Sequence, residues 1–188
     1  MGKIDFNYVN NLAFRDTDIN EHLLDLYGVA VGMNAKVIVE LGAGQSTYAL
    51  TAAANETKGQ LYSVDLGKDA VTRLFPQGEG VLDKEERYHF IQGDDMEIVK
   101  TWNTPIDFLF LDTSHLYEDT KKEIEAWFPK VKKGGIIAMH DVAHEEGLGT
   151  GCRKALDEFM KSEEGKDYRV LQLLDTKHLG MAILIKLL

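Results

Sequence analysis

This chain has only one cysteine, no recognisable signal segment and no long apolar run. Its 188 residues include a single cysteine, Cys152, so no internal disulfide framework can form, and a reducing compartment is compatible. No apolar run approaches the ~20 residues that span a bilayer, and the N-terminus carries no signal-peptide pattern. We therefore expect a cytoplasmic protein with no membrane partner.

Positive charge is also scarce. Lysine and arginine number 21 against 31 aspartates and glutamates, which gives a net charge of −10. Nucleic-acid binding needs a basic surface to neutralise phosphates, so this balance argues against a nucleic-acid partner. The length fits one domain, and a hydrophobic content of 44% is enough for a sizeable core.

Residues 37–47 have the pattern of a strand, a tight turn and the start of a helix. A β-branched run ends at Glu40, Gly42 and Gly44 follow, and an alanine-rich helix is predicted over residues 48–55. Glycines let the backbone approach a ligand closely, and a helix N-terminus offers N–H groups to an anion. The stretch therefore predicts a ligand-binding turn, although a turn that binds nothing stays open.

Three ligand classes compete for this turn. A dinucleotide fingerprint needs a third glycine where the chain has Thr47, and a mononucleotide P-loop needs a lysine that is absent. Residues 40–44, Glu-Leu-Gly-Ala-Gly, resemble motif I of the class I S-adenosyl-L-methionine (SAM) methyltransferases, in which an acid precedes the first glycine by two residues. The resemblance favours SAM over the two nucleotide classes.

Strand patterns alternate with helix patterns along the chain. This alternation predicts a Rossmann-like, doubly wound α/β fold with a mostly parallel seven-stranded sheet. The last two strands are separated by a short connection and should pair as an antiparallel hairpin, a second feature shared with class I methyltransferases. The expected strands cover residues 37–41, 60–64, 88–92, 106–111, 136–139, 168–174 and 180–185.

The region before the sheet shows less pattern. Residues 1–16 are interpreted as a loosely held lead-in, and Thr17 or Asp18 as the cap of a helix that follows. We therefore expect a lead-in and helix over residues 1–35 and a methyltransferase domain over residues 36–188. The further predicted helices cover residues 48–55, 96–100, 119–128 and 152–162, and residues 68–74 are predicted to form either a helix or an irregular segment.

Acids follow four successive predicted strands: Glu40, Asp65, Asp94 and Asp112. Open α/β sheets bind ligands outside the carboxyl ends of their strands. Ionised carboxylates only accept hydrogen bonds, and SAM offers ribose hydroxyls, an adenine amine and an ammonium. Asp65 lies 21 residues after Gly44, the spacing expected of an acid that accepts from both ribose hydroxyls.

The other cofactor contacts are predicted from the same edge of the sheet. Asp94 after Gly93 suits the adenine amine, and the backbone of Asp95 suits the ring edge. Glu40 and the glycine turn are expected to hold the methionine moiety and the ribose. The predicted cofactor-binding residues are Glu40, Gly42, Ala43, Gly44, Ser46, Asp65, Gly93, Asp94, Asp95 and Asp112.

Residues 111–118, Leu-Asp-Thr-Ser-His-Leu-Tyr-Glu, and residues 134–141, Gly-Gly-Ile-Ile-Ala-Met-His-Asp, carry a more specific resemblance. They are similar to the Asp-Gly-Asp-His-x-Tyr-Glu, Gly-Gly and His-Asp or Asp-Asp elements of one methyltransferase group. That group includes the macrolide and aminocoumarin sugar O-methyltransferases and the cephalosporin-hydroxylase-like proteins. The resemblance covers residues 20–186 and implies methyl transfer from SAM to a hydroxyl.

The same resemblance implies that Asp112, His140 and Asp141 bind a divalent cation beside the methyl group. Adjacent strands that end side by side can bring these three positions together. Mg²⁺ prefers oxygen ligands, whereas one imidazole with two carboxylates also suits Mn²⁺, Fe²⁺ or Zn²⁺. A dry acceptor pocket shaped by His140 and Asp141, without a cation, stays open as the alternative.

The chain departs from the group at the dipeptide after Asp112. Thr113 and Ser114 replace Gly-Asp, and Ser114 stands where the group has its proposed general base. His115 becomes the next candidate, since an imidazole can accept a hydroxyl proton near neutral pH. A structural role for His115 is equally open, and Asp112 is expected to be a metal ligand or a hydroxyl anchor. Four further residues are interpreted as structural or exposed: His89, His144, His178 and Cys152.

The sequence therefore predicts a SAM-dependent O-methyltransferase that acts on a small hydroxylated acceptor, with or without a divalent cation such as Mg²⁺ or Mn²⁺. One alternative is a non-catalytic SAM-binding module of the same fold that acts through a partner, and another is an NAD(P)-dependent enzyme. A homodimer is expected, since the short N-terminal region leaves a face uncovered.

Overall fold

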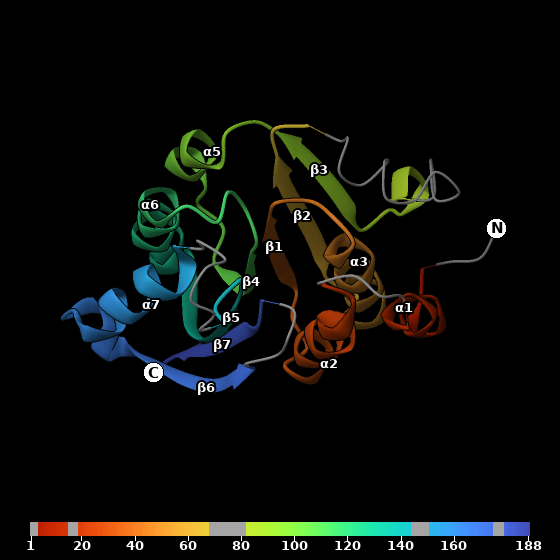
Figure 1. Ribbon diagram of the computed structural model, residues 1–188. Coiled ribbons are helices and arrows are strands. Elements are labelled where there is room, and N and C mark those ends of the chain that lie inside the picture. The colour runs from red at the N-terminus through yellow and green to blue at the C-terminus, as the bar shows by residue number, and fades with distance from the viewer. Residues whose placement is uncertain (1–3, 15–18, 68–81, 144–150, 175–178) are drawn as a thin grey trace. The chain divides into compact units, whose positions relative to one another are not determined.

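The computed structural model describes residues 4–14, 19–67, 82–143, 151–174 and 179–188 (Figure 1). By its internal contacts the chain divides into two compact units, Met1–Asp94 and Asp95–Leu188. This division does not test the domain boundary predicted at residue 35. Several predicted features lie outside the described residues: the caps Thr17 and Asp18, the helix or irregular segment over residues 68–74, His144 and His178.

The described residues form seven strands in the order β3-β2-β1-β4-β5-β7-β6. The pairs β1–β2, β2–β3 and β4–β5 are parallel, whereas β7 is antiparallel to both β5 and β6. The predicted fold class is therefore confirmed, including the C-terminal hairpin. The strands are β1 Val37–Leu41, β2 Gln60–Asp65, β3 Tyr88–Gln92, β4 Ile106–Leu111, β5 Val131–His140, β6 Tyr168–Leu174 and β7 Met181–Lys186.

Helices connect the strands, and none among the described residues is long and apolar enough to cross a bilayer. The α-helices are α1 Phe6–Ala13, α2 Leu23–Gly32, α3 Ser46–Thr57, α5 Asp95–Thr101, α6 Tyr117–Trp127 and α7 Cys152–Lys161. In the described ranges, four short 3₁₀ helices accompany them: η1 Asn20–His22, η3 Leu82–Lys84, η4 Phe128–Lys130 and η5 Glu164–Asp167.

The helix α1 lies where the sequence predicted a loosely held lead-in, and that prediction was wrong. Asp5 caps the helix, since its side chain accepts a hydrogen bond from the backbone N–H of Tyr8 at 3.1 Å. Ile4, Val9 and Leu12 are buried. Val9 and Leu12 are three residues apart and so share one helix face, which gives this short segment an apolar side to bury.

In the first unit, β1 lies beside β2 with Glu40 opposite Ser63 and Leu41 opposite Val64. Nearly all of α3 is buried, which its small alanines and threonines allow because they let other elements approach the helix closely. This packing fixes the start of α3 directly after the turn that follows β1.

In the second unit, β4 is buried along its whole length, as expected of a central parallel strand. β5 begins at Val131, five residues before the predicted start. The backbone of Gly134 has φ +76°, and the register with β4 shifts between Ile106 and Phe108. An irregular stretch therefore precedes the apolar part of β5, so the pattern alone placed the strand start too late.

Candidate active site

The predicted glycine turn connects β1 to α3 in the first unit. Gly42 has φ +86°, a conformation that favours glycine, and its N–H donates to the carbonyl of Val64 at 2.9 Å. A Cβ atom at Gly44 would meet no atom within 4 Å, so open space lies beside this glycine. The turn therefore has the close backbone approach that a ligand needs.

Glu40 lies in β1, two residues before the first glycine of the turn, and is fully buried. Its carboxylate accepts hydrogen bonds from the hydroxyls of Ser46 at 2.6 Å, Thr47 at 2.8 Å and Ser63. The acid thus ties the end of β1 to the start of α3 and to β2. Direct contact between Glu40 and a ligand stays a prediction. Sequence reasoning missed Thr47 and Ser63 as its partners.

Asp65 ends β2 beside the turn, as its spacing from the glycines predicted. One carboxylate oxygen accepts the N–H of Ala43 at 2.9 Å, and the other accepts the N–H of Gly67 at 2.9 Å. The side chain is partly exposed. Asp65 is therefore held in place by backbone donors while it remains accessible to a ligand.

The residues predicted for the adenine lie at the end of β3. The N–H of Gly93 donates to the carbonyl of Asp65 at 2.9 Å, which joins the ends of β2 and β3. Asp94 is exposed. Asp95 begins α5 in the second unit, and its carboxylate accepts the indole N–H of Trp127 at 3.1 Å. The side chain of Asp95 therefore anchors α6, which sequence reasoning did not foresee.

The second unit brings together Asp112, His115, His140 and Asp141, here named the histidine–aspartate cluster. In the parallel pair β4–β5, Leu111 lies opposite Met139, so Asp112 and His140 follow at the same edge. His115 Nε2 lies 3.1 Å from Asp112 Oδ1 and 3.0 Å from Asp141 Oδ2. His140 Nδ1 lies 3.6 Å from Asp112 Oδ1 and 3.3 Å from Asp141 Oδ2.

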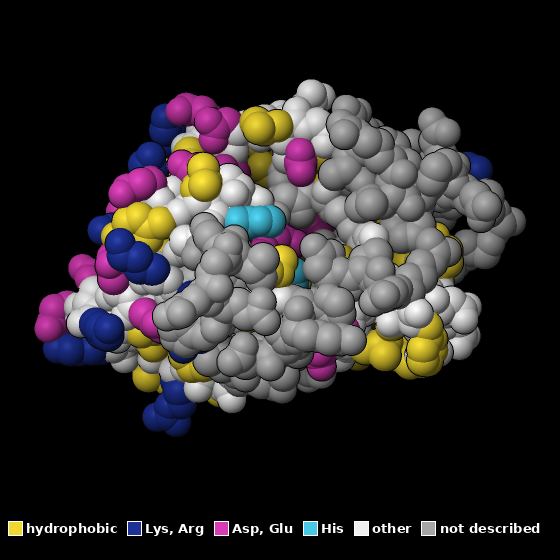
Figure 2. All heavy atoms as spheres, viewed as in Figure 1, with side chains coloured by type: hydrophobic (Ala, Val, Ile, Leu, Met, Phe, Trp, Pro, Cys, Tyr) yellow, Lys and Arg dark blue, Asp and Glu magenta, His cyan; other side chains and the backbone are white. Residues whose placement is uncertain are grey.

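Burial differs across the histidine–aspartate cluster. The side chains of His140 and Asp141 are 2% and 1% exposed, whereas those of Asp112 and His115 are 20% and 41% exposed. Figure 2 shows histidine side chains at the surface next to acidic ones. Asp112 and His115 are therefore the members that a bound molecule can touch.

Two members of the cluster have left-handed backbones, with φ +61° at His115 and +59° at Asp141. This conformation costs a non-glycine residue about 1–3 kcal/mol and is concentrated at functional sites. The N–H of Gly151, just before α7, donates to the carbonyl of His115 at 2.7 Å and so supports that turn. No sequence pattern marked either backbone conformation.

The carboxylates control the protonation of both imidazoles. Hydrogen bonds from His115 to Asp112 and Asp141 raise the pKa of His115 to about 10. Burial opposes the charged form of His140, yet Asp112 and Asp141 still raise its pKa to about 10. In turn the imidazoles lower the pKa of both carboxyls despite their burial. The two ionised carboxylates of this cluster are therefore stabilised by positive charge beside them.

Asp112, His115 and Asp141 offer ligand atoms that all lie within 4.8 Å of one another, which a single metal ion could bridge. The predicted ligand set contained His140 where this set contains His115. The structure thus places all four residues around one point. His115 was expected as a base or a structural residue, and its left-handed backbone is what carries it into the cluster.

Thr113 and Ser114, which replace the Gly-Asp of the resembling group, both face α6. The hydroxyl of Thr113 donates to the two carboxylate oxygens of Glu123 at 2.7 and 2.9 Å. The hydroxyl of Ser114 donates to Asp119 at 3.0 Å. Burial raises the pKa of Glu123 to about 7. Sequence reasoning missed Glu123, although its place four residues before Trp127 puts it on the inward face of α6.

Cys152 is buried at the start of α7, which agrees with its predicted packing role. Burial raises the pKa of its thiol to about 11, and its sulfur lies 3.5 Å from the hydroxyl of Thr120. The thiol of Cys152 therefore stays protonated near neutral pH, so α7 places no reactive thiolate near the histidine–aspartate cluster.

Residues 39–142, more than half of the chain, match a family described as a methyltransferase domain. The chain belongs to this methyltransferase family. Family and fold together confirm the resemblance to class I SAM-dependent methyltransferases that the glycine turn indicated. The narrower resemblance to sugar O-methyltransferases stays a prediction.

Solved structures share the fold of this methyltransferase at low sequence identity. An O-methyltransferase from Bacillus cereus in complex with S-adenosylhomocysteine (SAH) matches with a TM-score of 0.68 at 15% identity, over 96% of this chain and 86% of that one. The SAH-bound Podospora anserina methyltransferase PaMTH1 matches with 0.68 at 17%, over 99% and 88%. A Geobacter sulfurreducens methyltransferase matches with 0.66 at 16%, over 95% and 84%.

Proposed function

We propose that this methyltransferase transfers a methyl group from SAM to a hydroxyl of a small molecule, and that the histidine–aspartate cluster handles the acceptor. The geometry of this cluster is the main observation that supports the proposal. In a methyltransferase fold it joins two carboxylates and two imidazoles at the ends of β4 and β5, with Asp112 and His115 accessible. The solved O-methyltransferase structure from Bacillus cereus, which shares the fold, supports oxygen as the acceptor atom.

The first unit has residues that fit SAM. When bound, SAM supplies a methyl group activated by a positively charged sulfur. Asp65 would accept from the ribose hydroxyls, because its carboxylate is partly exposed and already aligned by two backbone donors. The glycine turn would hold the methionine moiety, since Gly44 leaves space beside the backbone. Asp94 would accept from the adenine amine.

The cluster would prepare the acceptor in three linked events. As the hydroxyl oxygen forms its bond to the methyl carbon, the bond from that carbon to sulfur breaks, and the hydroxyl proton must leave. Asp112 and His115 are the accessible members. The ionised carboxylate of Asp112 would receive that proton, and His115, which is already protonated near neutral pH because its pKa is raised to about 10, would help to orient the hydroxyl. Asp141 and His140, both buried, hold these two side chains in place.

The donor set also fits a divalent cation. Two carboxylates and an imidazole converge within 4.8 Å, and their negative charge is otherwise balanced by protons on the imidazoles. A bound cation would lower the pKa of a hydroxyl beside it. The mixture of nitrogen and oxygen ligands suits Mn²⁺, Fe²⁺ or Zn²⁺ as well as Mg²⁺.

The test separates cofactor binding from methyl transfer. Calorimetry with SAM and SAH should show binding by the parent protein and a loss of at least about tenfold in Asp65→Ala. Asp112→Asn, which removes one charge from a residue also predicted to contact the cofactor, should weaken binding less than Asp65→Ala does. Incubation with labelled SAM, hydroxylated acceptors and each cation should release SAH from the parent protein and not from Asp112→Asn. The exposed acid Glu97, outside both groups of residues, supplies the matched control Glu97→Gln.

The outcomes distinguish the alternatives. No affinity for SAM or SAH would overturn the proposal, and competition by NAD(P) would point to a dehydrogenase. Binding without turnover for every acceptor would favour a non-catalytic module. One observation supports the non-catalytic alternative. Ser114 stands where the sugar O-methyltransferase group has an acid, and its hydroxyl donates a hydrogen bond to Asp119.

A further inference from the structure

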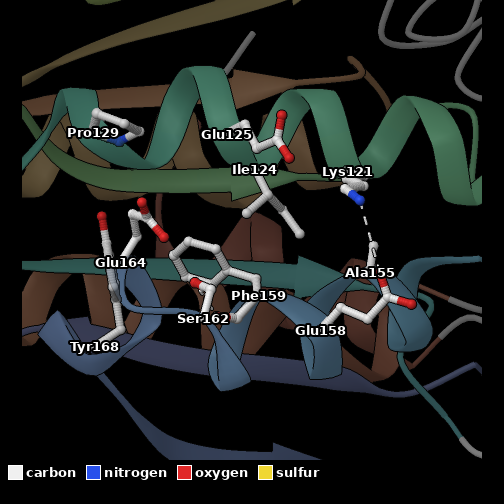
Figure 3. A pocket seen from close by; sticks show the side chains of 10 residues that line it. All are labelled: Lys121, Ile124, Glu125, Pro129, Ala155, Glu158, Phe159, Ser162, Glu164 and Tyr168. Atoms are coloured by element: carbon white, nitrogen blue, oxygen red, sulfur yellow. Dashed lines mark hydrogen bonds and ion pairs between the residues drawn. The ribbon is translucent and has the colours of Figure 1, made fainter.

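A second candidate site lies wholly within the second unit, between α6, α7 and the segment that begins β6. A cavity of about 510 Å³ opens there (Figure 3). This volume falls in the range of about 300–1,000 Å³ typical of small-molecule sites. None of its lining residues belongs to the histidine–aspartate cluster.

The inner wall of the cavity is apolar and aromatic. Ile124 of α6 and Ala155 of α7 are each 1% exposed, and the rings of Phe159 and Tyr168 close one end (Figure 3). These two rings meet at 67° with centroids 5.1 Å apart, so they form a corner with two faces. Phe128 packs edge-on against Phe159 at 88° and supports the corner.

The rim of the cavity is acidic. Glu125, Glu158 and Glu164 line it, and Lys121 is the one cation among its described lining residues. Glu158 already accepts a hydrogen bond from the hydroxyl of Tyr117 at 2.5 Å and pairs with Lys121 at 3.9 Å. For Glu125 and Glu164, the described part of the chain shows no ion pair within 4 Å. Both carboxylates border the cavity and are exposed (Figure 3).

We propose that this cavity binds a small organic cation, an ammonium group carried on an apolar or aromatic body. The body would pack on the partly exposed Phe159 and on Pro129, above the buried Ile124 and Ala155. The ammonium would face Glu125 and Glu164.

An ammonium gains electrostatic attraction from an aromatic face as well as from carboxylates, so the face of Phe159 and the acidic rim favour the same charge. The ring of Tyr168 already has the ammonium of Lys186 at 5.5 Å from its centroid. An anion would meet the rim glutamates, and a neutral molecule would use only the apolar wall.

The proposal does not depend on the methyl-transfer reaction, because it uses other residues and no cofactor. The chain's net charge of −10 attracts any cation weakly, so the experiment must separate this site from general attraction. Two comparisons do so: ligands of equal shape and different charge, and glutamate substitutions at and beside the cavity.

The probe is 2-phenylethylammonium, followed by NMR chemical-shift titration of the full chain. We expect saturable shifts at Ile124 and Ala155, and binding about tenfold weaker for neutral 2-phenylethanol, with none for 3-phenylpropionate. Glu164→Gln and Glu125→Gln should each weaken the ammonium several-fold. Glu163→Gln is the matched control, because Glu163 is 83% exposed, pairs with Lys166 and does not line the cavity.

Phe159→Leu tests the aromatic corner and should weaken the ammonium more than it weakens the alcohol. The glutamate variants keep the test informative if that core change lowers stability. The proposal is overturned if the alcohol binds as tightly as the ammonium, if Glu163→Gln weakens binding as much as Glu164→Gln, or if no saturable shifts appear at the lining residues.

Discussion

Replacing Glu123 with glutamine should stabilise the protein increasingly as the pH rises. Glu123 is 3% exposed on the inward face of α6, where it accepts the hydroxyl of Thr113. Burial raises the pKa of its carboxyl from 4.5 to about 7, against the lowering effect of that hydrogen bond and with support from nearby Asp95 and Asp119. Ionising this carboxyl inside the fold is therefore unfavourable.

The direction of the pH effect on stability follows from how tightly the folded and unfolded states bind the proton of Glu123. The folded-state pKa lies above the ordinary value, so the folded state holds the proton more tightly than the unfolded chain. The stabilisation that comes from this bound proton is fully present below about pH 4.5 and is lost as the pH rises through about 7. Fully ionised, the group costs about 3 kcal/mol. Glutamine has the same shape and no charge, so it keeps the contact with Thr113 and avoids this cost.

The assay is urea unfolding of the parent protein and Glu123→Gln between pH 5.5 and 8.5. We expect the variant to be more stable throughout, with the difference in unfolding free energy growing by about 2 kcal/mol across that range. Glu97→Gln, at an exposed glutamate of α5, should show a difference of less than about 0.5 kcal/mol at every pH. A pH-independent difference, or a variant less stable than the parent at pH 8.5, would refute the reasoning.

Three further predictions follow from single contacts. In Gly151→Ala the new Cβ would lie 2.0 Å from the backbone nitrogen of Tyr117, so the variant should lose about 2 kcal/mol or more of stability in thermal unfolding. The control is Gly28→Ala, which should be neutral or slightly stabilising because Gly28 is helical and has open space around it. Cys152 should resist a thiol reagent at pH 8 until denaturant is added, because its pKa is about 11; rapid native-state labelling would contradict this. Lys186→Met should cost about 2 kcal/mol in urea unfolding, because the ammonium donates to three carbonyls that follow α6; an unchanged midpoint would contradict that role.

Much of the fold could be predicted because it depends on local patterns. The apolar run over residues 108–111, after Asp107, identified β4, and the alternation of strands with helices indicated a parallel sheet. The glycines after Glu40 indicated the turn because their backbone freedom is a property of the residue itself. α1 was missed, since only two of its residues, Val9 and Leu12, are buried, too few to show a period.

The candidate site was predicted in part. Asp112, His140 and Asp141 could be placed at one edge because they end two strands that the sequence makes neighbours. The entry of His115 into the metal-compatible set could not be foreseen, because it depends on a left-handed backbone held by the N–H of Gly151, 36 residues further along the chain.

By itself, then, the sequence determined the seven strands and most of the helices between them, the glycine turn and the row of acids at strand ends, because these follow from hydrophobic period and residue chemistry. Only the tertiary structure decided that Glu40 is held by hydroxyls inside the turn and that Glu123 is buried. The same holds for the cavity between α6 and α7. Contacts with residues far apart in the chain decide where a side chain points and how exposed it is, and no local sequence pattern encodes those contacts.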